Sequence, residues 1–191
     1  MSTITEFIDN SKDTTIISFT GIGNDFGGIP PAEFRSLSLN YNMLFVTDDS
    51  RSWYNNIDVK KIISFLKKDQ SIITLGNSMG AFNACCFTND YKVKKCIMFA
   101  TQYSVYPKIV PFETRWKKFV KNIDIWHNKH LIFNNTTDYF IIQGSCSKDM
   151  QHLQLIPDQP NIKKIIIPNG SHSVARQLKK KGKLHNILDS I

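Results

Sequence analysis

The sequence lacks any apolar run long enough to cross a membrane. A membrane-spanning helix needs roughly 18 or more consecutive apolar residues, and no stretch of the 191 residues approaches that length. The amino-terminal segment MSTITEFIDNSKDT also lacks the basic flank and the apolar core of a signal peptide. The composition, 41% hydrophobic and 21% charged, is that of an ordinary globular protein. We therefore expect a single domain over residues 1–191, with no membrane span and a cytoplasmic location.

Cysteine is scarce, and its spacing excludes a disulfide framework or a zinc site. No two cysteines have C-x-x-C spacing, and one pair is adjacent. The four are Cys85, Cys86, Cys96 and Cys146. His127 and His130 have the i, i+3 spacing of a metal-binding pair, but two histidines alone do not complete a ligand set. We expect no metal and no resident cofactor.

Acidic residues are fewer than basic ones, 16 against 24, which leaves a formal net charge of +8. Such an excess attracts anionic partners, and lysines cluster near the carboxyl terminus at positions 179, 180, 181 and 183. No aromatic-interleaved basic motif and no nucleic-acid-binding module accompanies them. We expect lysine-rich solvated faces and no nucleic-acid partner.

What the chain does contain is a series of short apolar runs rich in β-branched residues. Each run is typical of a strand buried on both faces of a sheet. The runs are Thr14–Phe19, Met43–Thr47, Ser71–Leu75, Cys96–Ala100, Tyr139–Gln143 and Lys163–Ile167. After the second run, Val59, Ile62, Ile63 and Leu66 form a helical stripe. Strands that alternate with helices predict an α/β fold, a three-layer α/β/α sandwich around a mostly parallel, six-stranded sheet.

The interval at residues 101–138 breaks this alternation. It contains Trp116 and a predicted helix around Glu113–Lys121. We interpret it as a small lid-like insertion over the end of the sheet. Farther along, the pattern predicts a carboxyl-terminal helix over Ser173–Leu188, interrupted near Gly182.

A Gly-x-Ser-x-Gly motif follows the third predicted strand. It reads Gly76-Asn77-Ser78-Met79-Gly80 and leads directly into a helix of small residues. In a parallel sheet the reactive side chains gather at the carboxyl ends of the strands, where loops meet helix N-termini. The two glycines remove the Cβ atoms that would collide in a sharp strand-to-helix turn. We interpret Ser78 as a nucleophile that stands clear of its own backbone.

On this motif the sequence resembles the α/β-hydrolase family, in which the nucleophile, the acid and the histidine follow one another along the chain. The resemblance implies an acid after the fifth predicted strand and a histidine after the sixth. Asp149 and His172 stand at these places. His172 would be the general base, and Asp149 would orient it. Asp138 and Asp158 lie on neighbouring loops and are alternative acids, although Asp138 precedes its strand.

A narrower similarity is to small bacterial members of the family that accompany surface-polysaccharide biosynthesis. It rests on the segments TDDSRSWYN, LGNSMGAF and GSHSVARQLKKKG. Only 13 residues precede the first predicted strand, so we expect the antiparallel edge strands that open many members to be missing. The short insertion implies an open site, which favours a small acyl group on a larger polar carrier.

The loop after the first predicted strand, TGIGNDFGG, is rich in glycine. The resemblance implies that this loop supplies one backbone N–H of an oxyanion hole, at Ile22, and that Met79 supplies the other. A competing interpretation takes the glycines at positions 21, 23 and 27 as a dinucleotide-binding turn, with Asp48 holding a ribose. Prolines at positions 30 and 31 make the dinucleotide-binding interpretation less favourable, because they delay the helix that would bind the pyrophosphate.

The segment after the second predicted strand contains Asp48, Arg51, Trp53 and Tyr54. Hydrogen-bonding side chains beside aromatic faces suit a pocket wall that binds a polar, sugar-like group. The alternative is a surface Asp–Arg pair over a half-buried tryptophan.

These features favour a serine hydrolase that acts on carboxylic esters, an esterase or deacetylase, through an acyl-Ser78 intermediate. Its substrate would be a small-molecule or glycan ester. The alternative is an O-acyltransferase that uses the same Ser78, His172 and Asp149 to acylate a sugar hydroxyl, with acyl-coenzyme A as co-substrate. A non-catalytic binding protein on a hydrolase-like frame is the third interpretation.

Overall fold

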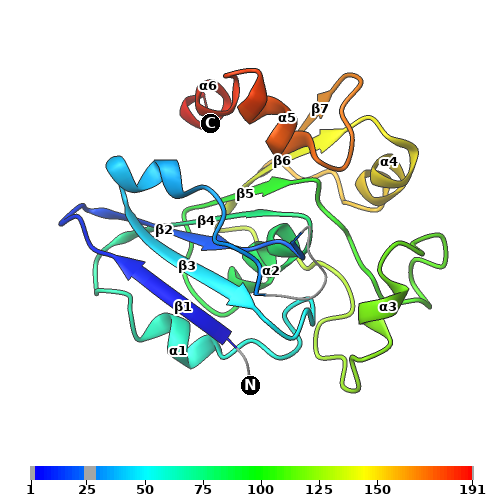
Figure 1. Ribbon diagram of the computed structural model, residues 1–191, viewed down its shortest axis with the longest axis horizontal. Helices are drawn as coiled ribbons and strands as arrows, with labels where there is room; N and C mark the ends of the chain where they lie inside the picture. The colour runs from blue at the N-terminus through cyan, green and yellow to red at the C-terminus, as the bar shows by residue number, and fades with distance from the viewer. Residues whose placement is uncertain (1–2, 24–28, 191) are drawn as a thin grey trace.

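The computed structural model describes residues 3–23 and 29–190. Its centre is a seven-stranded sheet with the strand order β1-β3-β2-β4-β5-β6-β7 (Figure 1). The strands are β1 (Thr3–Ile8), β2 (Thr14–Phe19), β3 (Asn42–Asp48), β4 (Ser71–Asn77), β5 (Lys95–Phe99), β6 (Asp138–Gly144) and β7 (Ile162–Ile167). Every neighbouring pair is parallel except β1 with β3. The predicted mostly parallel sheet is therefore confirmed.

The strand β1 corrects the sequence prediction in two ways. It raises the strand number from the expected six to seven. It also pairs antiparallel with β3 at the edge of the sheet, so the expectation that no antiparallel strand opens the chain is wrong. The segment TITEFI is not an apolar run, because an edge strand has one neighbour and keeps side chains such as Ile4 and Glu6 exposed.

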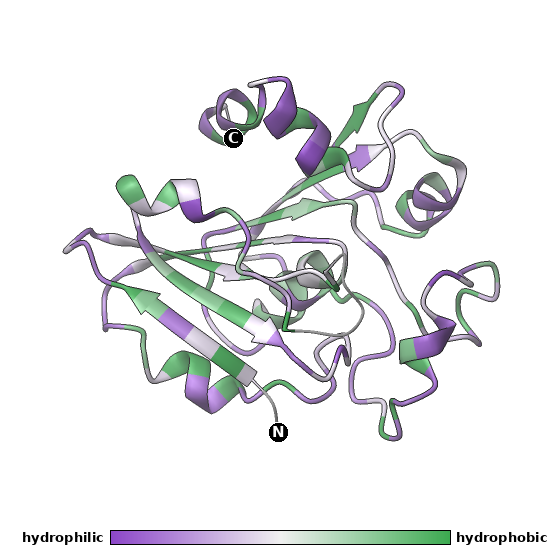
Figure 2. Cartoon of the chain, viewed as in Figure 1, coloured by the Kyte–Doolittle hydropathy of each residue, from purple (hydrophilic) through white to green (hydrophobic). Residues whose placement is uncertain are grey.

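Helices cover both faces of the sheet, which confirms the three-layer α/β/α arrangement. The helical segments are η1 (Arg35–Leu39), α1 (Val59–Ile63), α2 (Met79–Phe87), α3 (Lys117–Val120), α4 (Ser147–Gln154), α5 (Val174–Lys180) and α6 (Leu184–Asp189). Residues of α1, α2 and α4 belong to one apolar core, and residues of η1, α5 and α6 belong to the other. Neighbouring strand residues alternate between the two, as Ile16 and Ile17 do. Figure 2 shows β3, inside the sheet, largely in the colour of hydrophobic residues.

The predicted helices lie at the observed positions in the chain, but their predicted lengths differ from the observed ones. The stripe after β3 becomes α1, which ends at Ile63, so Leu66 lies beyond it. The carboxyl-terminal helix is interrupted as predicted, because Gly182 adopts a φ of +65° between α5 and α6. No described helix is both long and apolar enough to cross a membrane.

The insertion, residues 101–138, joins β5 to β6 with little regular structure. Its single described α-helix, α3, is shorter than the predicted Glu113–Lys121. The cause is local: the Glu113 carboxylate accepts the backbone N–H of Arg115, and this turn replaces the first helical turn. In Figure 1 the insertion lies beyond the ends toward which the arrows of β2 and β5 point, the side of the sheet where Ser78 stands.

Candidate active site

Ser78 occupies a strained turn between β4 and α2. Its φ of 57° and ψ of −119° are rare for a residue with a side chain, and such a conformation costs on the order of 1–3 kcal/mol. A Cβ at Gly76 would lie 2.2 Å from the Gly80 backbone, and one at Gly80 would lie 2.1 Å from the Phe19 carbonyl oxygen. The Ser78 N–H donates to the Phe99 carbonyl oxygen at 2.8 Å. Both glycines of the motif are therefore needed for the turn to fit against β2 and β5.

Ser78, His172 and Asp149 form one hydrogen-bonded chain. The Ser78 hydroxyl lies 2.8 Å from His172 Nε2, and His172 Nδ1 lies 2.9 Å from Asp149 Oδ1. When Nδ1 donates its hydrogen to the carboxylate, Nε2 is left to accept the serine proton. The three residues come from the start of α2, the first turn of α4 and the loop between β7 and α5. The structure thus brings together residues that the sequence placed at three separate strand ends.

Two glycines, one at the end of β6 and one in the loop after β7, allow Asp149 and His172 to meet. A Cβ at Gly144 would lie 2.5 Å from the Ser171 carbonyl oxygen, and one at Gly170 would lie 2.9 Å from Gly144 Cα. The buried amide of Gln143 also donates to the Asp149 carbonyl oxygen at 2.9 Å. The backbone on either side of the Asp149–His172 pair is therefore fixed by close packing and by a buried hydrogen bond.

Asp149 is fully buried and still holds its charge. Burial opposes ionisation, but the hydrogen bond from His172 is the largest of the interactions that outweigh it. The Cys146 thiol and the Arg115 guanidinium act in the same direction, so the pKa of Asp149 lies below its usual value. An ionised carboxylate is the state that can orient His172 and stabilise its protonated form.

The two alternative acids lie elsewhere. The Asp158 side chain is 98% exposed and pairs with Lys164 at 2.7 Å. Asp138 is the first residue of β6, at the end of the strand opposite to Asp149. Neither carboxylate contacts His172.

The predicted oxyanion donors lie on the two segments that flank the serine. Met79 is the first residue of α2, where a backbone N–H has no intrahelical acceptor. The Ile22 carbonyl oxygen accepts from Arg51 Nε at 3.3 Å. A Cβ at Gly21 would lie 2.8 Å from the Asn77 carbonyl oxygen. These contacts hold the loop after β2 close to the residue that precedes the serine.

Glu33, which the sequence did not single out, supports the same loop. Its carboxylate accepts the Gly21 N–H at 3.3 Å, and its carbonyl oxygen accepts the Ser18 hydroxyl at 3.0 Å. Burial raises the pKa of Glu33 to about 7, although the Gly21 N–H favours the charged form. The loop therefore rests on a carboxyl group that takes up a proton near neutral pH.

Comparison with known proteins gives matches at the level of structure. No protein-family model matches the sequence, and no curated protein sequence matches it. A mutant capsule O-acetyltransferase of Neisseria meningitidis serogroup A in complex with CoA has a TM-score of 0.63 at 15% identity, covering 94% of this chain and 91% of that chain. Est1E from Butyrivibrio proteoclasticus has a TM-score of 0.60 at 15% identity, covering 98% and 93%. An alpha/beta hydrolase enzyme from a lagoon-sediment metagenome has a TM-score of 0.59 at 17% identity, covering 97% and 95%. The chain has the α/β-hydrolase fold.

The α/β-hydrolase fold accounts for the placement of the three site residues. In enzymes of this fold the nucleophile, the acid and the histidine follow one another in this order along the chain. Here they follow β4, β6 and β7. The order of the elements therefore agrees with the order of Ser78, Asp149 and His172.

The structure places the four residues of the predicted pocket wall differently. Asp48 is buried, and its carboxylate accepts from Ser50 and Ser52. Trp53 is fully buried and donates from Nε1 to Gln102, and the Tyr54 hydroxyl, which is also buried, donates to the exposed Asp90 carboxylate at 2.7 Å. Arg51 reaches the loop after β2 and lies over an aromatic ring. The two aromatic faces are occupied by the core, so these residues brace the loop and offer no stacking surface to a ligand.

Among the residues that the structure describes after β2, no α-helix precedes β3 to support the dinucleotide interpretation. The residues described after β2 lead into a 3-10 helix, η1, and the Asp48 carboxylate is already occupied by serine donors. Position 27, the third glycine of that pattern, lies outside the described residues. Within 3–23 and 29–190, no three His, Cys, Asp or Glu side chains group to hold a metal ion.

Sequence reasoning missed a charged cluster directly behind the acid. Arg115 Nη1 donates to Asp149 Oδ1 at 2.9 Å, and Arg115 also contacts Glu113. The next residue, Trp116, lies against the His172 ring with 5.7 Å between ring centroids. Both contacts come from the insertion. An Arg-Trp pair in a loop of apolar and basic residues was the available signal, but only the fold shows what it contacts.

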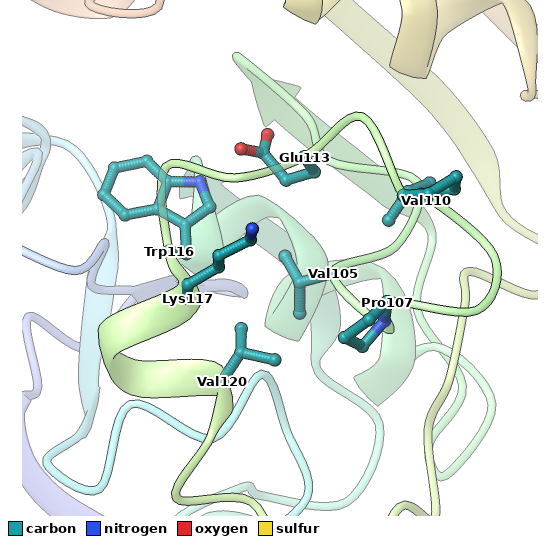
Figure 3. A pocket seen from close by; sticks show the side chains of 8 residues that line it. Val105, Pro107, Val110, Glu113, Trp116, Lys117 and Val120 are labelled. Atoms are coloured by element: carbon teal, nitrogen blue, oxygen red, sulfur yellow. The ribbon is translucent and has the colours of Figure 1, made fainter.

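Trp116 and Glu113 also line a small cavity inside the insertion. Its volume is about 40 Å³. Its walls are Val105, Pro107, Val110, Pro111, Glu113, Trp116, Lys117 and Val120. Figure 3 shows the three valines around the space, with Trp116 and Glu113 along one side. The same tryptophan thus contacts His172 and closes an apolar space.

Proposed function

We propose that this protein is a serine acyl hydrolase that cleaves carboxylic esters through an acyl-Ser78 intermediate. The observation that carries the proposal is the unbroken chain from the Ser78 hydroxyl to His172 Nε2, 2.8 Å, and from His172 Nδ1 to Asp149 Oδ1, 2.9 Å. A serine hydroxyl is a weak nucleophile until a positioned base accepts its proton. The strained turn at Ser78 adds support, because such strain persists mainly at functional sites.

The proposed reaction has two halves. In the first, His172 Nε2 takes the Ser78 proton while Oγ attacks the ester carbonyl, and the proton then passes to the leaving alcohol. In the second, His172 removes a proton from water, which attacks the acyl-Ser78 and frees the acid. Asp149 stabilises the imidazolium in both halves. The backbone N–H groups of Met79 and Ile22 are the proposed donors to the oxyanion.

A second candidate differs only in the acceptor of the acyl group. The structural likeness to a capsule O-acetyltransferase bound to CoA favours transfer of the acyl group from acyl-coenzyme A to a sugar hydroxyl. The first half-reaction would then release coenzyme A, and an alcohol would replace water in the second. The Ser78, His172 and Asp149 chain serves both reactions equally well.

A fluorophosphonate probe tests the nucleophile. Wild-type protein should be labelled at Ser78, while Ser78→Ala should not be labelled and His172→Ala should be labelled at least about a hundredfold more slowly. Ser64→Ala is the matched control, because this exposed serine follows α1, where its hydroxyl donates to the Lys61 carbonyl oxygen, and its loss should leave labelling unchanged. Labelling that does not depend on Ser78 would reject the enzyme and favour a non-catalytic binding protein.

Product analysis separates hydrolysis from transfer. The protein is supplied with acetyl-coenzyme A or p-nitrophenyl acetate, with and without an oligosaccharide acceptor. A hydrolase releases acetate at a rate that the oligosaccharide does not change. Release of coenzyme A that requires the oligosaccharide, together with an acetylated glycan in the mass spectrum, would assign the protein as an O-acyltransferase.

A further inference from the structure

The insertion is tied to α4 by two neighbouring polar contacts. Arg115 Nη1 donates to Asp149 Oδ1 at 2.9 Å. His152 Nε2 lies 3.0 Å from Glu113 Oε2. Asp149 and His152 stand three residues apart on one face of α4, and Glu113 and Arg115 stand two residues apart on the insertion. The two segments are therefore clamped at two points, and one of these points is the acid of the proposed site.

Within the clamp, Arg115 and Glu113 hold each other. The guanidinium contacts both Glu113 oxygens, at 3.1 and 3.0 Å from Nε and at 2.5 Å from Nη2. The side chains of Glu113 and Asp149 are almost fully buried, and that of Arg115 is 22% exposed. Burial opposes ionisation of Glu113, but the bonds from His152 and Arg115 outweigh it and hold the pKa of this carboxyl far below its usual value. One cation thus compensates two buried carboxylates, which is costly to disturb.

The same oxygen of Asp149 serves both Arg115 and His172. Oδ1 accepts from His172 Nδ1 and from Arg115 Nη1, each at 2.9 Å. A rotation of the carboxylate would break both bonds together. The orientation of the acid toward His172 is therefore coupled to the presence of Arg115.

The residue after Arg115 contacts the other end of the pair. Trp116 lies against the His172 ring, 5.7 Å between centroids, and also against Trp53 in the core, 6.4 Å between centroids. Two consecutive residues of the insertion therefore contact Asp149 and His172, respectively.

We propose that Arg115 is a positioning residue that holds Asp149 in line with His172 and makes the activity of Ser78 depend on the seating of the insertion against α4. This inference rests on the proposed function, because it assigns Arg115 a role in the same acyl-transfer site. Arg115 does not contact the reacting atoms and acts through Asp149.

Steady-state kinetics of Arg115→Met and Arg115→Lys on p-nitrophenyl acetate provide the test. Loss of alignment at Asp149 should lower kcat by about tenfold to a hundredfold and change KM by less than about twofold, because Arg115 acts through Asp149 and not on the bound ester. Arg115→Lys keeps the positive charge but loses the planar, bidentate donor geometry of the guanidinium group. It should therefore have a kcat between those of wild type and Arg115→Met. Guanidinium chloride at millimolar concentration should restore part of the kcat of Arg115→Ala. Arg176→Met, an exposed arginine of α5, is the matched control and should keep the wild-type kcat.

A double-mutant cycle with Asp149→Asn shows whether Arg115 acts through the acid. In the Asp149→Asn background, Arg115→Met should reduce kcat by less than about twofold further. An undiminished effect in that background, or a kcat of Arg115→Met within about twofold of wild type, would overturn the inference. Thermal unfolding shows whether Arg115→Met is folded. If it is not, the kcat of Arg115→Lys and the guanidinium rescue of Arg115→Ala provide the test.

The outcomes also separate this inference from the proposed function. If Ser78 is labelled by a fluorophosphonate in both wild type and Arg115→Met and kcat is unchanged, the positioning role fails and the serine hydrolase stands. If wild-type Ser78 is not labelled at all, the proposed function fails, and the role of Arg115 fails with it.

Discussion

Two regions of the molecule are stabilised by different interactions. One is the sheet with the turns at its strand ends, and the other is the insertion. Around Ser78 the backbone is fixed by close packing, since a Cβ at Gly76 or Gly80 would lie within 2.2 Å of neighbouring backbone. The insertion has four residues of α-helix, α3, and is held by side-chain contacts such as that from Arg115 to Asp149. The sheet positions Ser78, and the insertion contacts Asp149 and His172. Substitutions in the two regions should therefore change activity and stability in different ways.

The largest expected effect is at Asp149, where the two regions meet. Asp149→Asn keeps the shape of the side chain but can favour the wrong tautomer of His172, and it should lower kcat/KM by about 10³- to 10⁴-fold. Ester hydrolysis at neutral pH measures this, with circular dichroism to confirm folding. Asp158→Asn is the control, because its carboxylate is exposed and pairs with Lys164. Equal losses in the two variants would move the acid away from Asp149.

The next effect tests the close packing of the elbow. Gly80→Ala would place a methyl group 2.1 Å from the Phe19 carbonyl oxygen, and backbone cannot yield as a flexible side chain can. We expect a loss of about 3 kcal/mol or more in the free energy of unfolding, together with loss of Ser78 labelling. Gly182→Ala is the matched change, since nothing lies within 4 Å of a Cβ there and only its φ of +65° is unfavourable. It should cost about 1 kcal/mol, measured by urea unfolding.

A smaller effect, dependent on pH, is expected in the insertion. The pKa values of Glu113 and Asp149 are both lowered in the folded protein. Their contribution to stability is therefore complete above the unfolded pKa values, near 4, and is lost as the pH falls below them. Glu113→Gln should be less stable than wild type at pH 7 and should lose less stability between pH 5 and pH 3. Urea unfolding at several pH values checks this, and parallel curves for both proteins would contradict it.

The smallest effect is a gain in stability at the nucleophile. Ser78 has a φ of 57°, which glycine adopts without strain. Ser78→Gly should therefore unfold with a free energy about 1 kcal/mol higher than that of Ser78→Ala, while both are inactive. Equal stability of the two variants would show that the turn is not strained.

The sequence predicted the sheet well because the relevant signals are local. Apolar β-branched runs gave the six parallel strands within a residue or two of their observed ends, and the two glycines around Ser78 marked the turn. The edge strand β1 was not predicted, because Thr3–Ile8 needs no continuous apolar run when one side faces solvent. The strand-end positions of Asp149 and His172 followed from the same local pattern.

The contacts of the insertion could not be predicted in this way. Arg115 and Asp149 are 34 residues apart in the sequence, and their meeting depends on how an irregular segment packs. The burial of Trp53 and Tyr54 was also not predicted. Their hydrogen-bond partners, Gln102 and Asp90, lie on distant segments of the chain. Periodicity reports which side of an element is apolar, and it does not report which loop covers it.

Trapping of the acyl-enzyme tests directly whether Ser78 is the nucleophile. Protein mixed with p-nitrophenyl acetate or acetyl-coenzyme A and quenched with acid within seconds is digested and analysed by mass spectrometry. We expect one acetyl group on the peptide that contains Ser78 in wild type, its accumulation in Asp149→Asn, and its absence in Ser78→Ala. Turnover of either donor with no acetyl group on Ser78 under any of these conditions would show that Ser78 is not the nucleophile.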